Sequence, residues 1–333
     1  MENFAVDIVI PWVDSSSEKW RENFEFYKSL EEVNVGEEGF RSSPKLLNLW
    51  LIGASKYASW ARKIFIVVDR LTDLSGLNVQ DEKIEIVYHD QFIPIEFLPT
   101  FNSNVIECFV YLIPNLAERF VLFNDDCYLT NQTTQEDFFT PHGKAIDSDQ
   151  VYPVGASEVY SHTIVNNLIF INDQIDYKKY QNKFLKRRIF SILNLRTLRT
   201  LLFNEMLSSF HGWQDEHVPV AYTKTMFRQT FGEHTYLHQR LLNGSRFRSF
   251  TDVSHLLVRF WRLARFDYAP RPFRSLGVYT EMQPGLEQSN LKRILEKNKK
   301  IICVNDVAMS NEDARQSYIS LTRILTEFYG RDL

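Results

Sequence analysis

RFVLFNDDCYL, at residues 119–129, is an apolar segment of strand-like composition that is interrupted by two adjacent acids. Three further runs have the same continuous apolar character: DIVIPW at residues 7–12, KIFIVVD at 63–69 and IEIVYH at 84–89. Strands of this kind are covered on both faces, as they are in parallel sheets. The sequence therefore predicts an α/β fold with a mixed, mostly parallel sheet covered by helices.

Helical patterns separate these predicted strands. Ser43 and Pro44 are the residue types expected at an N-cap and a first helical position, and apolar residues then recur at helical spacing as far as Ala58. A second helix is predicted after LPTFNS, with Asn102 or Ser103 as its cap and a helical apolar pattern. Helices and strands therefore alternate through the first half of the chain.

Composition favours one large folded domain. The chain has 333 residues, of which 44% are apolar and 14% aromatic, so we expect a single catalytic domain over residues 1–333. A formal net charge of −4 argues against nucleic acid as a partner, because a phosphate backbone calls for a basic surface.

The cysteines and the N-terminus bear on the cellular compartment. Cys108, Cys127 and Cys303 are widely spaced and form no CxxC pair, so neither a disulfide framework nor a zinc knuckle is predicted. The acidic N-terminal residues do not fit a signal peptide, and no stretch has the roughly 18–20 apolar residues that cross a bilayer. We therefore expect a cytoplasmic protein, either soluble or peripheral at the inner face of the cell membrane.

Residues 174–210 differ from the rest of the chain and predict a basic, amphipathic helical insert. Eight lysines and arginines lie from Lys178 to Arg199, and one helical stripe could combine Phe184, Ile189, Ile192, Leu195, Leu198 and Leu202. This pattern favours contact with an anionic lipid surface. The alternative is a helix packed on its own domain with its charges in water.

The acids of FNDDCY are the strongest local signal of chemistry. Ligands of open α/β sheets bind at the carboxyl ends of strands, and adjacent carboxylates there can hold a hard cation that bridges a diphosphate. Strand alternation points Asn124 and Asp126 to the same side. A plain Asx-turn is the alternative. Asp14, shortly after the first predicted strand, has a comparable position.

Other candidates are single residues of suitable chemistry. Glu107 lies on a mostly apolar predicted helix, where a carboxylate is costly to bury unless it is paired or used. His217 can transfer protons near neutral pH, and Arg246 and Arg248 can grip phosphate oxygens.

Four blocks of the chain resemble, in order, the Stealth family of hexose-1-phosphate transferases. They are VDIVIPWVD, the stretch from KYASWARKIFIVVD through LPTFNSNVIE and FNDDCYL to DFFTPHG, the pair HVP and SRFRSFTDVS, and IICVND. The family includes bacterial phosphotransferases of capsule and exopolysaccharide synthesis. The resemblance extends from residue 6 to residue 306, and it implies a fold like that of nucleotide-sugar transferases.

The resemblance also implies an activity: transfer of hexose-1-phosphate from a UDP-hexose donor to a hydroxyl of a growing exopolysaccharide or capsule. The acceptor is a polysaccharide or a lipid-linked oligosaccharide, a phosphodiester forms, and UMP leaves. Carried over residue by residue, the catalytic set is Asp126, His217, Arg248 and Glu107. The substrate-binding set is Asp14, Asn102, Asp125, Arg246, Asp252, Asn305 and Asp306.

Within this scheme His217 is the first choice as general base, with Asp126 as the alternative. A divalent cation, Mg²⁺ or Mn²⁺, is expected on Asp126 together with Asp125, where it would hold the diphosphate. Two other functions stay open: a conventional glycosyltransferase that releases UDP, and an inactive scaffold of a polysaccharide assembly complex.

Among the departures of the chain from the family pattern are two positions of arginine. Asn48 and Ile52 stand where the family usually has arginines. If those arginines bind donor phosphate, then Arg41, Arg62 or the pair Arg246 and Arg248 must replace them, or the choice of donor has changed.

Overall fold

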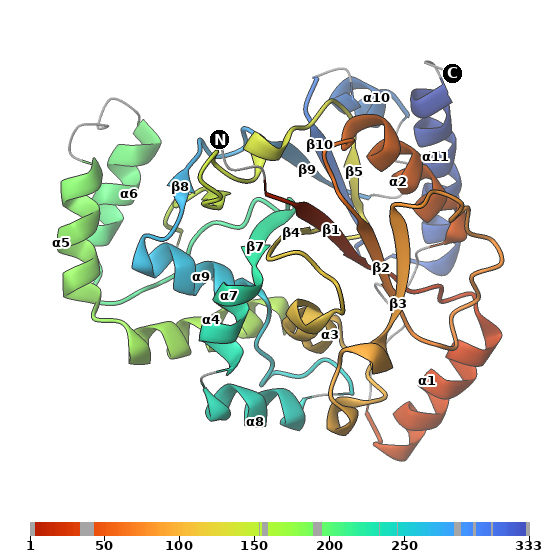
Figure 1. The fold of residues 1–333 in the computed structure, drawn as a ribbon, viewed down its shortest axis with the longest axis horizontal. Coiled ribbons are helices and arrows are strands. Elements are labelled where there is room, and N and C mark those ends of the chain that lie inside the picture. Colours follow the sequence, from red (N-terminus) through yellow and green to blue (C-terminus); the bar gives the residue numbers. More distant parts are fainter. Residues whose placement is uncertain are drawn as a thin grey trace.

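The structure is a computed structural model that describes residues 4–33, 43–152, 154, 159–188, 195–232, 234–244, 246–282, 288–295, 298–307 and 309–330. Its centre is a five-stranded sheet with the order β3-β2-β1-β4-β7 (Figure 1). The strands are β1 (Val6–Pro11), β2 (Ile64–Val68), β3 (Ile84–Tyr88), β4 (Arg119–Leu122) and β7 (Val220–Thr223). Only β7 is antiparallel to its neighbour, so the predicted mixed, mostly parallel sheet is confirmed.

Alternate residues of each strand enter two separate apolar cores, one on each face of the sheet. Val9 and Phe120 belong to one core and Ile8 and Val121 to the other. The first is covered by α3 (Ser103–Phe109), α4 (Val159–Gln174), α7 (Lys224–Phe227), α8 (Thr235–Asn243) and α9 (Leu256–Arg265). The second is covered by α2 (Pro44–Tyr57), α10 (Gln288–Leu295) and α11 (Asn311–Gly330).

A second sheet, which the sequence did not predict, meets the first at the FNDDCY turn. It has the order β5-β10-β9, with β5 (Cys127–Leu129) antiparallel to β10 (Ile301–Asn305) and β9 (Gly277–Glu281) parallel to it. Because β4 ends just before the acids and β5 begins just after them, the turn lies at the junction of the two sheets. A two-stranded pair, β6 (Ile146–Asp147) and β8 (Ala269–Pro270), completes the strands described.

The predicted helix starts are confirmed by their caps. The Ser43 hydroxyl accepts a hydrogen bond from the backbone N–H of Leu46 at 3.4 Å, and Pro44 is the first residue of α2. Of the two alternatives at α3, Asn102 is the N-cap, and its side-chain oxygen accepts from the N–H of Asn104 at 3.1 Å. These bonds satisfy amides that a helix start leaves without an intrahelical partner.

The predicted basic insert forms two helices, α5 (Tyr177–Arg188) and α6 (Leu195–Met206), at one edge of the molecule (Figure 1). The prediction of a single apolar stripe is wrong, because the two helices use their apolar residues differently. Phe184 is buried and packs near Phe266, with ring centroids 6.4 Å apart, whereas Leu198 and Leu202 are exposed. Ile189 and Ile192 lie outside the described residues.

Two further findings complete the architecture. Helix α1 (Glu18–Leu30) packs through Trp20 and Phe24 onto Phe101 and Phe247, beside the loop that leads into α3.

Among the residues that the structure describes, we find no helix with the length and apolar character needed to span a membrane.

Candidate active site

The sheet topology brings several predicted site residues to one edge. β1 and β4 are parallel neighbours, so Asp14 and the turn at residues 124–126 follow strand ends on the same side of the sheet. β7 runs the opposite way, with Val220 paired to Leu122, and this places His217 at that edge too. Because β2 and β4 flank β1 on opposite sides, the edge is a topological switch point, where ligands of α/β sheets bind.

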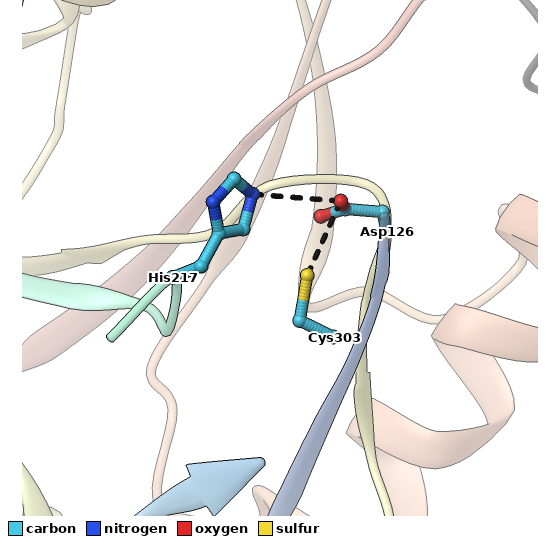
Figure 2. Close-up of side chains that lie close together, drawn as sticks. All are labelled: Asp126, His217 and Cys303. Atoms are coloured by element: carbon cyan, nitrogen blue, oxygen red, sulfur yellow. Dashed lines mark hydrogen bonds and ion pairs between the residues drawn. The ribbon is translucent and has the colours of Figure 1, made fainter. Parts of the chain in front are cut away.

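Asp126 and His217 form the centre of this edge. Their Oδ2 and Nε2 atoms are 3.6 Å apart, and Figure 2 shows the imidazole and the Cys303 sulfur both directed at the Asp126 carboxylate. The Cys303 thiol donates to Oδ2 at 3.3 Å and the Cys127 thiol to Oδ1 at 3.4 Å. The Asn124 amide nitrogen is 3.4 Å from His217 Nε2, so Asn124 and Asp126 point the same way, as strand alternation predicted.

The two side chains stabilise each other's charged form. Burial alone would raise the pKa of Asp126, but hydrogen bonding and the charge of His217 hold it below its usual range. Burial alone would lower the pKa of His217, yet the hydrogen bonds with Asp126 and Cys303 and the negative charge beside it raise that pKa to about 11. These contacts therefore favour the protonated form of His217. A general base needs the neutral imidazole, which the contacts disfavour, so that role of His217 stays a prediction.

The backbone around His217 is held in an uncommon conformation. The φ angle of His217 is 49°, in the left-handed region that costs a non-glycine residue of order 1–3 kcal/mol. Its N–H donates to the Asp215 carboxylate at 3.0 Å, and that carboxylate also accepts from the Tyr160 hydroxyl at 2.8 Å. Asp215 thus fixes the turn that aims the imidazole at Asp126.

Glu107 is the second carboxylate of the site and has the opposite pKa shift. Its side chain is 15% exposed, and Oε2 lies 3.4 Å from His255 Nε2. Burial raises the pKa of Glu107 to about 7; the charge of Arg248 pulls the pKa down and that of Asp125 adds to the rise. A carboxyl with this pKa can exchange a proton at neutral pH.

Arg248 supplies a cation beside Glu107. It lies on the exposed loop before α9, and its Nη2 donates to the Ser103 hydroxyl at 2.8 Å. Ser103 is one helical turn before Glu107 on α3, so the guanidinium lies over the face that carries the carboxylate. Since the pKa of Glu107 responds to both Arg248 and His217, the four predicted catalytic residues belong to one site.

Asn102 and Asp252, both predicted to bind substrate, are buried and hydrogen-bonded to protein groups. The Asn102 amide donates to Asp252 Oδ2 at 2.9 Å and to the Gly244 carbonyl at 2.8 Å, and Asn104 donates to the same Oδ2 at 3.0 Å. These bonds tie the loop that bears Arg248 to the start of α3. They act on the site by positioning that loop.

Arg246 also has a structural position. Its guanidinium lies 4.2 Å from the centre of the Tyr27 ring, pairs with Glu31 on α1's C-terminal side and donates to the Pro99 carbonyl at 2.9 Å. All these partners are protein groups, so the predicted role in substrate binding has no direct geometric support.

Asp14 follows a strand end, as predicted, and Asn305 and Asp306 lie at another strand end, that of β10. Asp14 is buried and accepts from the N–H of Ser16 at 2.9 Å and from its hydroxyl at 2.6 Å. Asn305 ends β10, beside the turn, because the N–H of Val304 donates to the Asp126 carbonyl at 3.0 Å. Its amide donates to the Asp306 carbonyl at 2.8 Å.

Among the residues that the structure describes, Asp126, His217 and Cys303 form a group that could hold a metal ion. One donor atom of each lies within 4.8 Å of the others. Carboxylate, imidazole and thiol together fit a borderline-soft ion better than Mg²⁺, which prefers oxygen ligands. Mg²⁺ is commonly bound by one or two carboxylates together with the phosphates of the substrate. Asp126 and the adjacent Asp125 could supply those carboxylates.

The positions that depart from the family pattern have local roles. The Asn48 amide donates to the Gly76 carbonyl at 2.8 Å and its oxygen accepts from the N–H of Asn78 at 2.8 Å, while Ile52 is exposed on α2. Arg62 pairs with Asp7 at the start of β1, the opposite edge of the sheet, so it does not replace a phosphate-binding arginine. Arg41 lies outside the described residues.

Sequence reasoning missed several residues in and around the catalytic set. His255 contacts Glu107, Tyr222 contacts His255, and Cys303 contacts Asp126. His255 directly follows the SRFRSFTDVS block, which could have drawn notice to it. Nothing local marks Tyr222 or Cys303, because their partners are distant in the chain.

The chain is similar to known polysaccharide phosphotransferases over most of its length. Residues 40–147 match the family model Stealth protein CR2, conserved region 2. An exopolysaccharide phosphotransferase of Lactiplantibacillus plantarum is 32% identical over 318 residues, which cover 92% of this chain and 89% of that protein. A capsular polysaccharide phosphotransferase of Streptococcus pneumoniae is 29% identical over 305 residues, covering 90% of each. Among solved structures, a bifunctional glycosyltransferase aligns with 99% of this chain and 52% of its own at 12% identity and a TM-score of 0.40, too low to add to the assignment.

Proposed function

The chain belongs to the Stealth family of polysaccharide phosphotransferases, and on that premise we propose that it transfers a hexose-1-phosphate from a UDP-hexose to a sugar hydroxyl of a growing exopolysaccharide or capsule. The products are a sugar–phosphate–sugar diester and UMP. One observation carries the proposal: a carboxyl group with a pKa of about 7 lies among two cationic side chains at the ligand-binding edge of the sheet. That is a proton acceptor beside a site for a diphosphate.

Each residue of the site has a role in this reaction. Glu107 accepts the proton of the acceptor hydroxyl, and the oxygen attacks the β-phosphorus of the donor. The bond from that phosphorus to the bridging oxygen breaks, and UMP leaves with the electron pair. The His217 imidazolium and the Arg248 guanidinium stabilise the negative charge on the transferred phosphoryl group and on the leaving oxygen. Asp126 keeps His217 charged and oriented.

A divalent cation, Mg²⁺ or Mn²⁺, on Asp126 and Asp125 would neutralise charge on the donor diphosphate when bound. The remaining predicted substrate residues, Asp14, Asn305 and Asp306, are available at the strand ends for the nucleotide or sugar. Asn102, Arg246 and Asp252 contribute by holding the surrounding loops.

The nucleotide product tests the proposal. A conventional glycosyltransferase breaks the bond between the sugar carbon and oxygen and releases UDP, whereas the proposed reaction releases UMP. The protein is incubated with a panel of UDP-hexoses and candidate acceptors, and UMP and UDP are separated by chromatography. UMP formed only with acceptor supports the proposal, and UDP contradicts it. An inactive scaffold gives neither product and no thermal shift with UDP-hexose and cation.

The exposed side of α5 and α6 supports a second part of the proposal, contact with an anionic membrane surface where a lipid-linked acceptor is held. Leu198, Leu202 and Met206 recur every four residues on α6 and are 40%, 55% and 80% exposed. Lys178, Lys179 and Lys186 are exposed on α5. Apolar and basic side chains side by side are the features that bind an interfacial helix to anionic lipid. The protein then works at the inner face of the cell membrane.

A further inference from the structure

Glu107 is backed by a histidine and a tyrosine that no part of the proposed reaction uses. His255, the N-cap of α9, places Nε2 at 3.4 Å from Glu107 Oε2. Its other ring nitrogen, Nδ1, is 2.8 Å from the hydroxyl of Tyr222 on β7, and that hydroxyl is 3.2 Å from the His255 carbonyl. The three side chains form a continuous row of polar contacts from three elements. Tyr222 is fully buried at its inner end.

The position of the Tyr222 proton decides the tautomer of the histidine. Which ring nitrogen of a neutral imidazole carries the proton is set by the hydrogen bond that the other nitrogen makes. The phenol has one proton and two acceptors within reach, Nδ1 at 2.8 Å and the His255 carbonyl at 3.2 Å. A phenol proton on the carbonyl puts the ring proton on Nδ1. A phenol proton on Nδ1, the shorter contact, puts the ring proton on Nε2, which faces Glu107 Oε2. This arrangement leaves the other carboxylate oxygen, Oε1, to accept a proton.

The charge state of His255 affects the basicity of Glu107, and burial favours the neutral imidazole. Burial lowers the pKa of His255 to about 4; the charge of Asp215 opposes this shift, and the charges of Arg259 and His217 add to it. The charged groups that face Glu107 itself are Arg248, Asp125 and His217. A cationic His255 would stabilise the carboxylate much more strongly and make it a weaker base. A neutral donor orients the carboxylate while leaving it able to take up a proton near pH 7.

We propose that His255 and Tyr222 are positioning residues of the transfer site: the Tyr222 phenol fixes His255 as the Nε2–H tautomer, and this N–H holds Glu107 Oε2 so that Oε1 faces the acceptor hydroxyl. The inference rests on the proposed function, since it assigns the support of the group that accepts the proton. It adds two residues that act through Glu107 and touch no substrate.

Three substitutions separate positioning from mere packing. His255→Phe keeps the ring volume and removes the Nε2–H donor, Tyr222→Phe removes only the hydroxyl, and His255→Gln restores an N–H that can reach the carboxylate. We expect kcat to fall about 10-fold or more for His255→Phe and less for Tyr222→Phe, with KM for the donor nearly unchanged. The acid limb of the kcat/KM profile should move to higher pH in His255→Phe, because Glu107 loses its donor. His255→Gln should recover most of both losses.

The control is His142→Phe, at an exposed turn position, which should leave kcat and the pH profile unchanged. Wild-type kcat with an unshifted acid limb in His255→Phe would overturn the proposal. Equal losses in His255→Phe and His255→Gln would also overturn it, since they indicate packing alone. These comparisons hold whether UMP or UDP is released, so a failure of the proposed function is seen separately in the nucleotide product.

A measurement on the wild-type protein covers the case in which the variants do not fold. The ¹⁵N chemical shifts of the His255 ring distinguish a protonated Nε2 from a protonated Nδ1 and from the imidazolium. The neutral Nε2–H tautomer is expected at pH 7. Either of the other two forms would overturn the proposal without any measurement of activity.

Discussion

Two carboxylates of one site have pKa values shifted in opposite directions, and this difference assigns their roles. Asp126 accepts hydrogen bonds from two thiols and faces the His217 imidazolium, so it stays ionised. Glu107 is buried beside a neutral histidine, and its pKa rises to about 7. Pairs of titratable groups with diverging pKa values are typical of acid–base sites. In the proposed reaction Glu107 is therefore the residue that moves a proton, and Asp126 the one that holds charge.

Substitution of Asp126 by Asn should abolish most turnover while the fold survives. The change removes the negative charge that keeps His217 protonated and oriented, and loss of one preorganised electrostatic group costs about 100-fold or more in kcat. Steady-state kinetics and a thermal melt measure the two effects. Asp173→Asn, an exposed site on α4, is the matched control and should be neutral. Near-normal kcat in Asp126→Asn would remove this carboxylate from the chemistry.

Replacing Glu107 by Gln should lower activity, and it should raise the stability of the protein at high pH. Since the folded pKa of about 7 lies above the ordinary 4.5, this carboxyl favours folding most below about pH 4.5, and that contribution is lost as pH rises through 7. The shift corresponds to about 3 kcal/mol. At pH 8 the variant should unfold at higher urea than the wild type, and near pH 5 the difference should shrink. A variant that is less stable at pH 8 would contradict the pKa assignment.

At the scale of elements, the loop before α9 depends on one buried carboxylate. Asp252 accepts hydrogen bonds from Asn102, Asn104 and Ser249, and so fixes the loop that bears Arg248 against α3. Asp252→Ala leaves several donors without partners and should cost about 2–4 kcal/mol of unfolding free energy. It should also raise KM for the donor, because Arg248 loses its position.

Urea denaturation and donor titration measure these two effects. Asp267→Ala is the matched control, since Asp267 makes only an exposed pair with Lys144 at 3.6 Å, and such pairs contribute at most about 1 kcal/mol. Unchanged stability in Asp252→Ala would show that the buried network does not hold the loop.

The surface of α5 and α6 gives a prediction about membranes. A variant with Leu202→Ser, Met206→Ser and Gln at Lys178, Lys179 and Lys186 should no longer sediment with anionic vesicles at low salt. Each lysine contributes up to about 1 kcal/mol beside an anionic surface. Physiological salt weakens this attraction for charges that lie more than about 8 Å from the surface. Ile319→Ser, at an exposed site on α11, should have no effect. If the wild type itself does not sediment at low salt, the surface is not a membrane contact.

At the scale of the molecule, local sequence pattern was enough to predict the four parallel strands of the first sheet, but not β7 or the second sheet. β1 to β4 are apolar runs, and each could be recognised from its own residues. β5 has only three residues and pairs with β10 near the other end of the chain, with Cys127 opposite Cys303. Pairing over that sequence distance leaves no local signal, so the thiols beside Asp126 could not be predicted.

Some features of the site could likewise be predicted from the sequence, and others could not. Family resemblance gave the positions of Asp126, His217, Glu107 and Arg248, which the structure brings to one edge of the sheet. It did not show that Asn102 and Asp252, both predicted to bind substrate, are hydrogen-bonded to each other. Nor could a sequence show that Asp126 raises the pKa of His217, since that shift depends on a 3.6 Å contact between side chains far apart in the chain.

The path of the donor's β-phosphate tests the central claim most directly. The wild-type protein and Asp126→Asn are incubated with acceptor and a UDP-hexose that carries ³²P in its β-phosphate. Hexose-1-phosphate transfer places the label, counted by its radioactivity, in the polysaccharide and leaves unlabelled UMP. The diester itself is identified by ³¹P NMR of the product made from unlabelled donor. Asp126→Asn should show almost none of this transfer. Label found in UDP, with a polysaccharide that contains hexose but no phosphorus, would contradict the account.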